Sequence, residues 1–135
     1  MTPKISFKVE KLVRDKMPEI LMGKGITVFA HKIDKEQYVS LLKDKLLEEA
    51  AELFESTTIE EIKEEIADLL EVIHAFSKLH DISLEEIEQM RVLRKEEKGG
   101  FEEGTYNEVV EMPLDHESVT YYKARPHKYP EINKK

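Results

Sequence analysis

The stretch LLEEAAELFESTTIEEIKEEIADLL, residues 46–70, decides the fold and carries the candidate site. It contains two acidic pairs, Glu49 with Glu52 and Glu65 with Asp68, each with a spacing of three residues. This spacing places both carboxylates of a pair on one face of a helix. Each pair lies among apolar residues, where unpaired charge is costly. The stretch therefore predicts two helices whose carboxylates need a positive partner.

The link between these two helices is short, which predicts an antiparallel hairpin. Glu49 lies seven residues before Ser56, and Glu65 lies seven residues after Thr58. At about 1.5 Å per residue, both pairs then stand roughly 10 Å from the turn. The four carboxylates are therefore predicted to come level with one another across the hairpin.

Converging carboxylates repel one another unless a cation lies among them, and Mg²⁺ prefers oxygen ligands and often accompanies a phosphate substrate. Taken singly, each acidic pair is also compatible with an ordinary solvated helix face, because 37% of the residues are charged. The equal distance of the two pairs from the turn favours a metal site, although both interpretations stay open on the residues alone.

The whole chain has 135 residues, which suits one domain with a modest core. We expect this domain to have its core at about 10–104 and a tail at 105–135. No apolar run reaches the length of a membrane span and no signal peptide is evident, so we expect a cytoplasmic protein. The absence of cysteine excludes disulfides and thiolate metal sites, and it fits a reducing compartment.

The net charge of −8 is unevenly distributed. Residues 34–80 carry 13 acidic and 5 basic side chains, whereas residues 1–33 carry 3 acidic and 7 basic ones. The acidic centre argues against a nucleic-acid-binding surface, because backbone phosphates need a basic face. A basic arm beside acidic helices instead suits a metal–phosphate ligand.

Three capping boxes predict the main helices, since Asp34, Thr58 and Ser83 are each followed three residues later by Glu or Gln. The predicted helices span about 35–55, 59–80 and 84–97, preceded by a short helix at 18–22 and an extended segment at 26–30. The Gly99–Gly100 pair ends the third helix. We expect the tail to be mostly irregular.

The apolar residues of the two central helices recur at helical spacing, and those of the first helix are predicted to face inward. They are Tyr38, Leu41, Leu42, Leu46, Leu53 and Phe54 in the first helix, and Ile59, Ile62, Ile66, Leu69, Leu70, Ile73 and Phe76 in the second. A hairpin alone cannot cover both faces. The fold class is therefore predicted to be an all-α helical bundle completed by oligomerisation, as a homodimer or homotetramer.

The segment Glu48–Glu52, followed by Glu65–Asp68, resembles the E-E-x-x-E and E-x-x-D signature of the MazG-like nucleotide pyrophosphohydrolases. This all-α superfamily includes dimeric dUTPases and phosphoribosyl-ATP pyrophosphohydrolases. Two further stretches, Lys11–Ile20 and Lys98–Phe101, are similar to its smaller members. The resemblance covers roughly residues 10 to 104.

The resemblance implies hydrolysis of a nucleoside triphosphate between its α and β phosphorus atoms, which gives a monophosphate and pyrophosphate. It implies that Glu49, Glu52, Glu65 and Asp68 ligate Mg²⁺, with Mn²⁺ as a possible substitute. Glu48 and Glu49 are the candidate catalytic residues, and Glu48 is either a further ligand or the base that orients the attacking water. The implied cellular role is removal of non-standard or excess nucleotides.

Basic residues on either side of the acidic helices are candidates for binding the phosphate chain. They are Lys11, Arg14 and Lys16 near the start, and Arg94, Lys95 and Lys98 before the glycine pair. The alternatives are a solvated basic arm and cations that complement a helix end. For the whole protein, the rival interpretations are a phosphoribosyl-ATP pyrophosphohydrolase and a non-catalytic acidic helical module that binds a basic partner.

Overall fold

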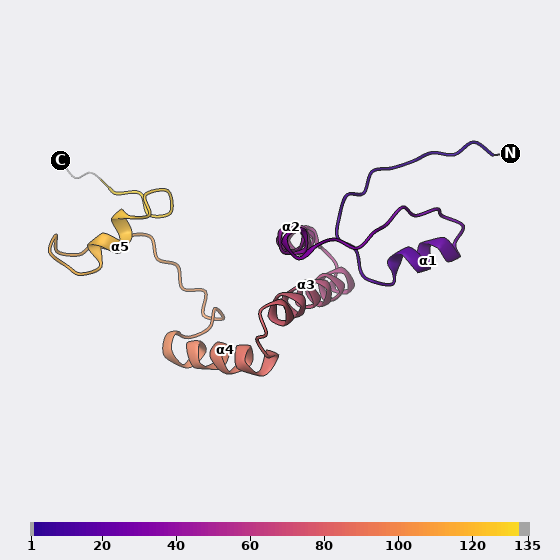
Figure 1. Cartoon of the computed structure of the whole chain (residues 1–135). Helices are drawn as coiled ribbons and strands as arrows, with labels where there is room; N and C mark the ends of the chain where they lie inside the picture. Colours follow the sequence, from indigo (N-terminus) through magenta and orange to yellow (C-terminus); the bar gives the residue numbers. More distant parts are fainter. Residues whose placement is uncertain (1, 133–135) are drawn as a thin grey trace. The chain divides into compact units, whose positions relative to one another are not determined.

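The computed structural model describes residues 2–132, and this part of the chain contains helices and no strand (Figure 1). The helices are α1 (Met17–Gly23), α2 (Lys35–Glu55), α3 (Ile59–Leu79), α4 (Leu84–Lys98) and α5 (Val119–Lys123). This confirms the all-α class. None of these helices combines the length and the apolar character that crossing a membrane requires.

Contacts divide the chain into two compact units, Met1–Arg94 and Lys95–Lys135. The acidic pairs and the N-terminal basic segment both belong to the first unit. The boundary of the predicted single domain, with its core at about 10–104, stays a prediction.

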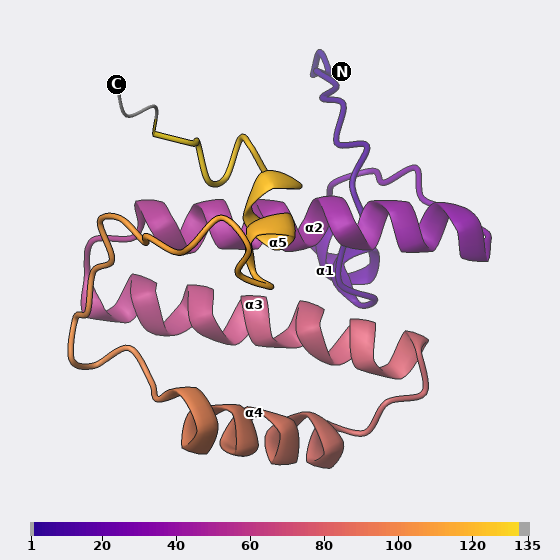
Figure 2. The same cartoon turned by 90° about the vertical axis from the view of Figure 1, so that its left-hand side faces the viewer.

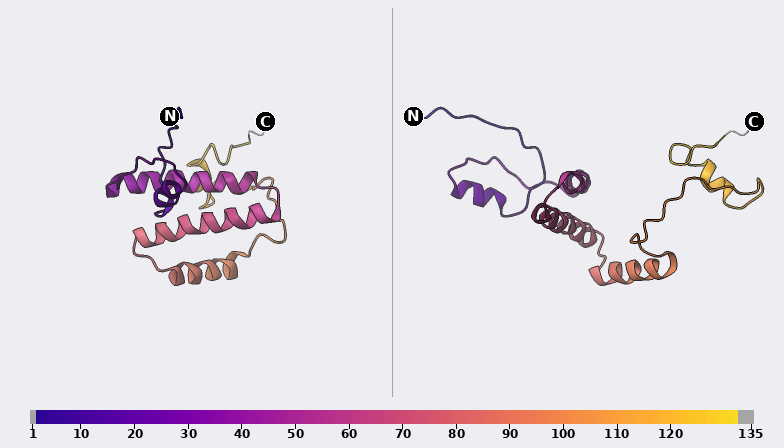
Figure 3. Two further views of the ribbon diagram at one scale, coloured as in Figure 1. Left: turned by 90° about the vertical axis from the view of Figure 1, so that its right-hand side faces the viewer. Right: turned by 180° about the vertical axis from the view of Figure 1, so that it is seen from behind.

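The centre of the first unit is an antiparallel hairpin of α2 and α3, which lie side by side in opposite views (Figures 2 and 3). Ser56–Thr58 make the short link, as predicted. The most buried apolar side chains are Leu42 of α2 and Val72 of α3, which are 2% and 7% exposed. Burial of such side chains is the main force that holds the two helices together.

The helix starts agree with the capping pattern, because three side chains accept hydrogen bonds from backbone N–H groups three residues further on. The pairs are Asp34 with Gln37 at 2.8 Å, Thr58 with Glu61 at 3.1 Å, and Ser83 with Glu86 at 3.1 Å. The Glu61 carboxylate also accepts from the backbone N–H of Thr57. Each cap satisfies donors that the first turn would leave unpaired.

The prediction of an inward-facing apolar set on α2 is wrong for Phe54, and three apolar residues of α3 are exposed as well. Phe54 and Ile59, beside the turn, are 90% and 69% exposed, and Ile66 and Leu70 are also exposed. Two packed helices bury one stripe each, whereas the apolar band on this hairpin is wider than one stripe. The outer part of the band consequently faces away from the partner helix.

The N-terminal segment runs from residue 2 through α1, which has a proline in its first turn as predicted. After α1 the chain turns at Gly25, whose φ of +83° suits a residue without a side chain. Residues 26–30, predicted to be extended, lie in irregular chain between α1 and α2.

The second unit contains α5, a short helix that the prediction of a mostly irregular tail did not include. The rings of Tyr121, Tyr122 and Tyr129 pack on one another, with centroids 4.8–6.1 Å apart. The guanidinium of Arg125 lies 3.9 Å from the centre of the Tyr121 ring. These contacts stabilise the segment around α5.

Candidate active site

Three carboxylates meet where the two central helices face each other. Oxygen atoms of Glu49 on α2 and of Glu65 and Asp68 on α3 all lie within 4.8 Å of one another. Glu49 is buried, at 7% exposed, and the other two residues are half-buried. The acidic residues of α2 and α3 therefore lie opposite each other across the hairpin, as predicted.

Glu52, the fourth predicted ligand, lies on the more exposed side of this group. Its carboxylate lies near enough to both Glu49 and Glu65 to raise their pKa values. The structure thus brings three of the four predicted residues together and places Glu52 beside them. We call Glu49, Glu52, Glu65 and Asp68 the carboxylate cluster. Their role as metal ligands stays a prediction.

Two members of the carboxylate cluster, Glu65 and Glu49, have raised pKa values. Burial raises the pKa of Glu65 to about 7, and the contact with Glu52 and the charges of Asp68 and Glu49 act in the same direction. Burial and then Glu52 also raise the pKa of Glu49, against the opposing charge of Lys45. These shifts follow from like charges placed close together away from water.

Two oxygens of the cluster have no hydrogen-bond donor. Glu49 Oε2 and Glu65 Oε2 are buried, and neither has a partner among the described residues. A buried carboxylate oxygen left in this state is unfavourable. The atoms available to ligate a metal are all carboxylate oxygens, with no nitrogen or sulfur. The cluster therefore fits a hard divalent cation such as Mg²⁺ or Mn²⁺.

Basic side chains of the N-terminal segment contact the carboxylate cluster and the neighbouring Glu48. The Arg14 guanidinium donates from Nη2 to Asp68 Oδ1 at 2.7 Å, and the Lys11 ammonium donates to Glu48 Oε1 at 3.3 Å. Glu48 therefore lies beside the cluster, turned toward cations. Two of the predicted phosphate-binding residues are thus held at the acidic site by their own carboxylate partners.

Lys45 is a residue of the site that the sequence analysis missed. Its Nζ lies 3.5 Å from Glu48 Oε1 and 3.6 Å from Glu49 Oε1. The signal was present in the sequence, because residues three and four apart on a helix are neighbours on its surface. Lys45 stands at these two spacings from the acidic residues it meets.

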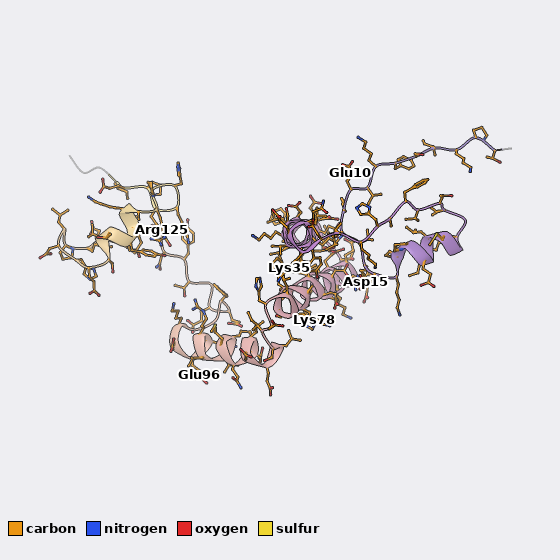
Figure 4. All side chains as sticks on the ribbon, viewed as in Figure 1. Glu10, Asp15, Lys35, Lys78, Glu96 and Arg125 are labelled. Atoms are coloured by element: carbon orange, nitrogen blue, oxygen red, sulfur yellow. The ribbon has the colours of Figure 1, made fainter. Side chains whose placement is uncertain are left out.

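An open cavity of about 500 Å³ adjoins the carboxylate cluster. The N-terminal segment forms one wall, with Arg14 and Lys16, and the hairpin forms the other, with Lys45, Glu49 and Asp68. Asp15, labelled in Figure 4, marks where this segment reaches the hairpin. Ligand pockets commonly have volumes of about 300–1,000 Å³, so the cavity is large enough for part of a nucleotide.

The wall of the cavity changes character along the hairpin. Charged side chains gather near Glu49 and Asp68, whereas Leu42, Val72 and Ala75 provide an apolar surface further from the turn. Such a division suits a ligand with an anionic chain and a less polar body.

Three further basic residues, at the end of α4, were predicted to bind the phosphate chain. Arg94, Lys95 and Lys98 are exposed, and α4 ends after Lys98 where Gly99 has a φ of +85°. The helix stop predicted at this glycine pair is confirmed. A contact between these three residues and a substrate stays a prediction.

Carboxylates on two antiparallel helices, beside a cavity lined by both basic and acidic side chains, suit an α-helical hydrolase that acts on phosphate anhydrides. Residues 15–93 match the phosphoribosyl-ATP pyrophosphohydrolase family, and the chain belongs to this family, which is part of the MazG-like all-α superfamily. Searches of curated proteins and of solved structures gave no match. Membership of the family supports pyrophosphohydrolase activity on a nucleotide.

Proposed function

We propose that the protein hydrolyses phosphoribosyl-ATP to phosphoribosyl-AMP and pyrophosphate with a divalent cation, Mg²⁺ or Mn²⁺. The observation that carries the reaction type is the carboxylate cluster, in which two buried oxygens have no donor. The match to the phosphoribosyl-ATP pyrophosphohydrolase family supports this substrate over free nucleoside triphosphates.

Glu49, Glu52, Glu65 and Asp68 would hold the cation. When bound, it neutralises charge on the phosphate chain and lowers the pKa of a coordinated water. In the reaction, the water oxygen forms a bond to the α phosphorus, and the bond from this phosphorus to the bridging oxygen breaks. Pyrophosphate leaves with the bonding electrons.

The other residues of the site position the substrate and the water. Glu48 is our candidate for the base, because its carboxylate lies next to the cluster and keeps its orientation through Lys11 and Lys45. Arg14, Lys16 and Lys45 line the cavity and are suited to binding the phosphate chain. Catalysis of this kind depends mainly on positioning and on charge neutralisation.

Hydrolysis of free nucleoside triphosphates, as a means of removing non-standard or excess nucleotides, is the second candidate. It is favoured by Lys11 and Arg14, which contact acidic residues of the site but precede the matched residues 15–93. They belong to a stretch that resembles the smaller MazG-like proteins. Both substrates share the triphosphate, so the same residues would serve either reaction.

We also propose that two or more copies associate through the exposed apolar band of the hairpin. Phe54, Ile66 and Leu70 are exposed on α2 and α3, and α4 adds Leu84 and Leu93. Exposed apolar patches of this kind are commonly interaction sites. A homodimer or homotetramer would cover them.

A substrate panel with pyrophosphate release as the readout tests the proposed function. Phosphoribosyl-ATP should exceed ATP in kcat/KM by about a hundredfold or more, because a site built for the additional group rejects a substrate that lacks it. Comparable rates on standard or modified triphosphates would establish the second candidate instead. No turnover of any nucleotide by metal-loaded protein would favour the non-catalytic acidic module.

A further inference from the structure

The closest ion pair at the site joins segments that are far apart in the sequence. Arg14 Nη2 lies 2.7 Å from Asp68 Oδ1, and 54 residues separate the two. Asp68 is also one of the three residues whose oxygens lie within 4.8 Å of one another. The guanidinium therefore contacts one of the carboxylates that would bind a cation.

The remainder of the site shows which groups have been neutralised and which have not. Glu49 Oε1 has Lys45 at 3.6 Å, whereas Glu49 Oε2 is buried without a donor, on a residue that is only 7% exposed. Lys45 and Arg14 thus pair with Glu49 Oε1 and Asp68 Oδ1, whereas the buried oxygens Glu49 Oε2 and Glu65 Oε2 have no partner among the described residues. This difference points to a ligand that binds the unpaired carboxylate oxygens and competes with Arg14 for Asp68.

The ion pair of Arg14 with Asp68 is weak enough to be displaced. Its two side chains are 57% and 39% exposed. Exposed pairs are worth at most about 1 kcal/mol, or about fivefold in an affinity. Arg14 also lines the cavity, where a phosphate chain would offer the guanidinium two acceptor oxygens at once.

We propose that Arg14 is a displaceable counter-ion, which neutralises Asp68 in the metal-free protein and moves to the phosphate chain when a divalent cation binds. This inference rests on the proposed function, because it requires the carboxylate cluster to bind a cation. It adds an order to the events at the site: metal binding frees the guanidinium, and the freed guanidinium strengthens binding of the phosphate chain.

The test measures two affinities of the full chain without turnover. Mn²⁺ binding is followed by the electron paramagnetic resonance signal of the free ion, and binding of inorganic pyrophosphate is followed by calorimetry with saturating Mn²⁺. Arg14→Gln should tighten Mn²⁺ binding by about two- to fivefold, since it removes the competitor. It should weaken pyrophosphate binding by about tenfold or more, because a charge-assisted contact is lost.

Lys16→Gln is the matched control for the general effect of removing a positive charge. Lys16 lines the same cavity wall, and among the described contacts its side chain has no ion pair. It should leave Mn²⁺ affinity nearly unchanged. Arg91→Gln, which breaks an arginine–carboxylate pair with Glu88 on α4, should change neither affinity.

The outcomes separate the inference from the proposed function. If wild-type protein binds no Mn²⁺, the proposed function fails. If wild type binds Mn²⁺ but Arg14→Gln binds it equally well or less well, the displacement is wrong and the metal site stands. Equal tightening in Lys16→Gln would also overturn the displacement. Arg14→Lys retains the charge, so it provides a folded comparison if Arg14→Gln proves unstable in circular dichroism.

Discussion

Metal-linked stability is the most direct consequence of the carboxylate cluster. In metal-free protein, four carboxylates lie together and two of their buried oxygens lack donors. A ligand that binds only the native state adds RT ln(1 + [L]/Kd), which is about 2.7 kcal/mol at a hundredfold excess over Kd. For a chain of this length about 4 °C accompanies each kcal/mol, so the unfolding transition should rise by about 10 °C.

The assay is thermal unfolding by circular dichroism after treatment with chelator, with Mg²⁺ added back in steps. The double variant Glu65→Gln with Asp68→Asn removes two charges from the cluster while retaining side-chain size, and it should lose the response to Mg²⁺. Glu60→Gln, on the exposed start of α3, is the matched control and should respond like wild type. The same rise in the double variant as in wild type would refute a metal site on these helices.

The other predictions concern pH, catalysis and packing. The free energy of unfolding of metal-free protein should fall from pH 5 to pH 8, because folding raises the pKa of Glu65 from 4.5 to about 7. The contribution of Glu65 to stability is complete below its unfolded pKa and is lost as pH rises through its folded pKa. Urea unfolding in chelator measures it, and Glu65→Gln should flatten the profile. Asp68→Asn should lower kcat by about 10²–10³ through lost charge stabilisation, with unchanged far-ultraviolet circular dichroism; near-normal turnover would contradict its role. Leu42→Ala should cost about 2–5 kcal/mol in the same urea assay, because Leu42 is only 2% exposed. Thr58→Ala should cost about 1 kcal/mol by removing the cap of α3, and a change below the error of the assay would show that this cap is dispensable.

The features that could be predicted from the sequence depend on short-range interactions. Caps at Asp34, Thr58 and Ser83 bond to groups three residues away, so the pattern of residues contains both partners. The approach of Glu49 to Glu65 is a longer-range contact, but a short turn and a constant rise per residue determine it. These rules placed α1, α2, α3 and α4 within one residue of their observed ends, whereas α5 was not predicted.

The features that escaped prediction depend on partners that local rules do not specify. The contact between Arg14 and Asp68 requires the N-terminal segment to return to the hairpin, and no periodicity encodes that return. The exposure of Phe54 depends on how much of a wide apolar band one neighbouring helix can cover. Lys45 was different, because its spacing from Glu49 was visible and only its relevance was missed.

Because the two acidic pairs lie equally far from the turn, the number of residues between the turn and each pair determines whether the pairs lie opposite each other. One residue inserted between the turn and either pair would rotate that pair by about 100° and advance it by about 1.5 Å, which would take its carboxylates out of register with the others. Seven residues added to both arms would turn each pair through nearly two full revolutions and keep them opposite each other. Moving the acidic pairs further from the turn therefore requires matched insertions between the turn and the pair in both helices.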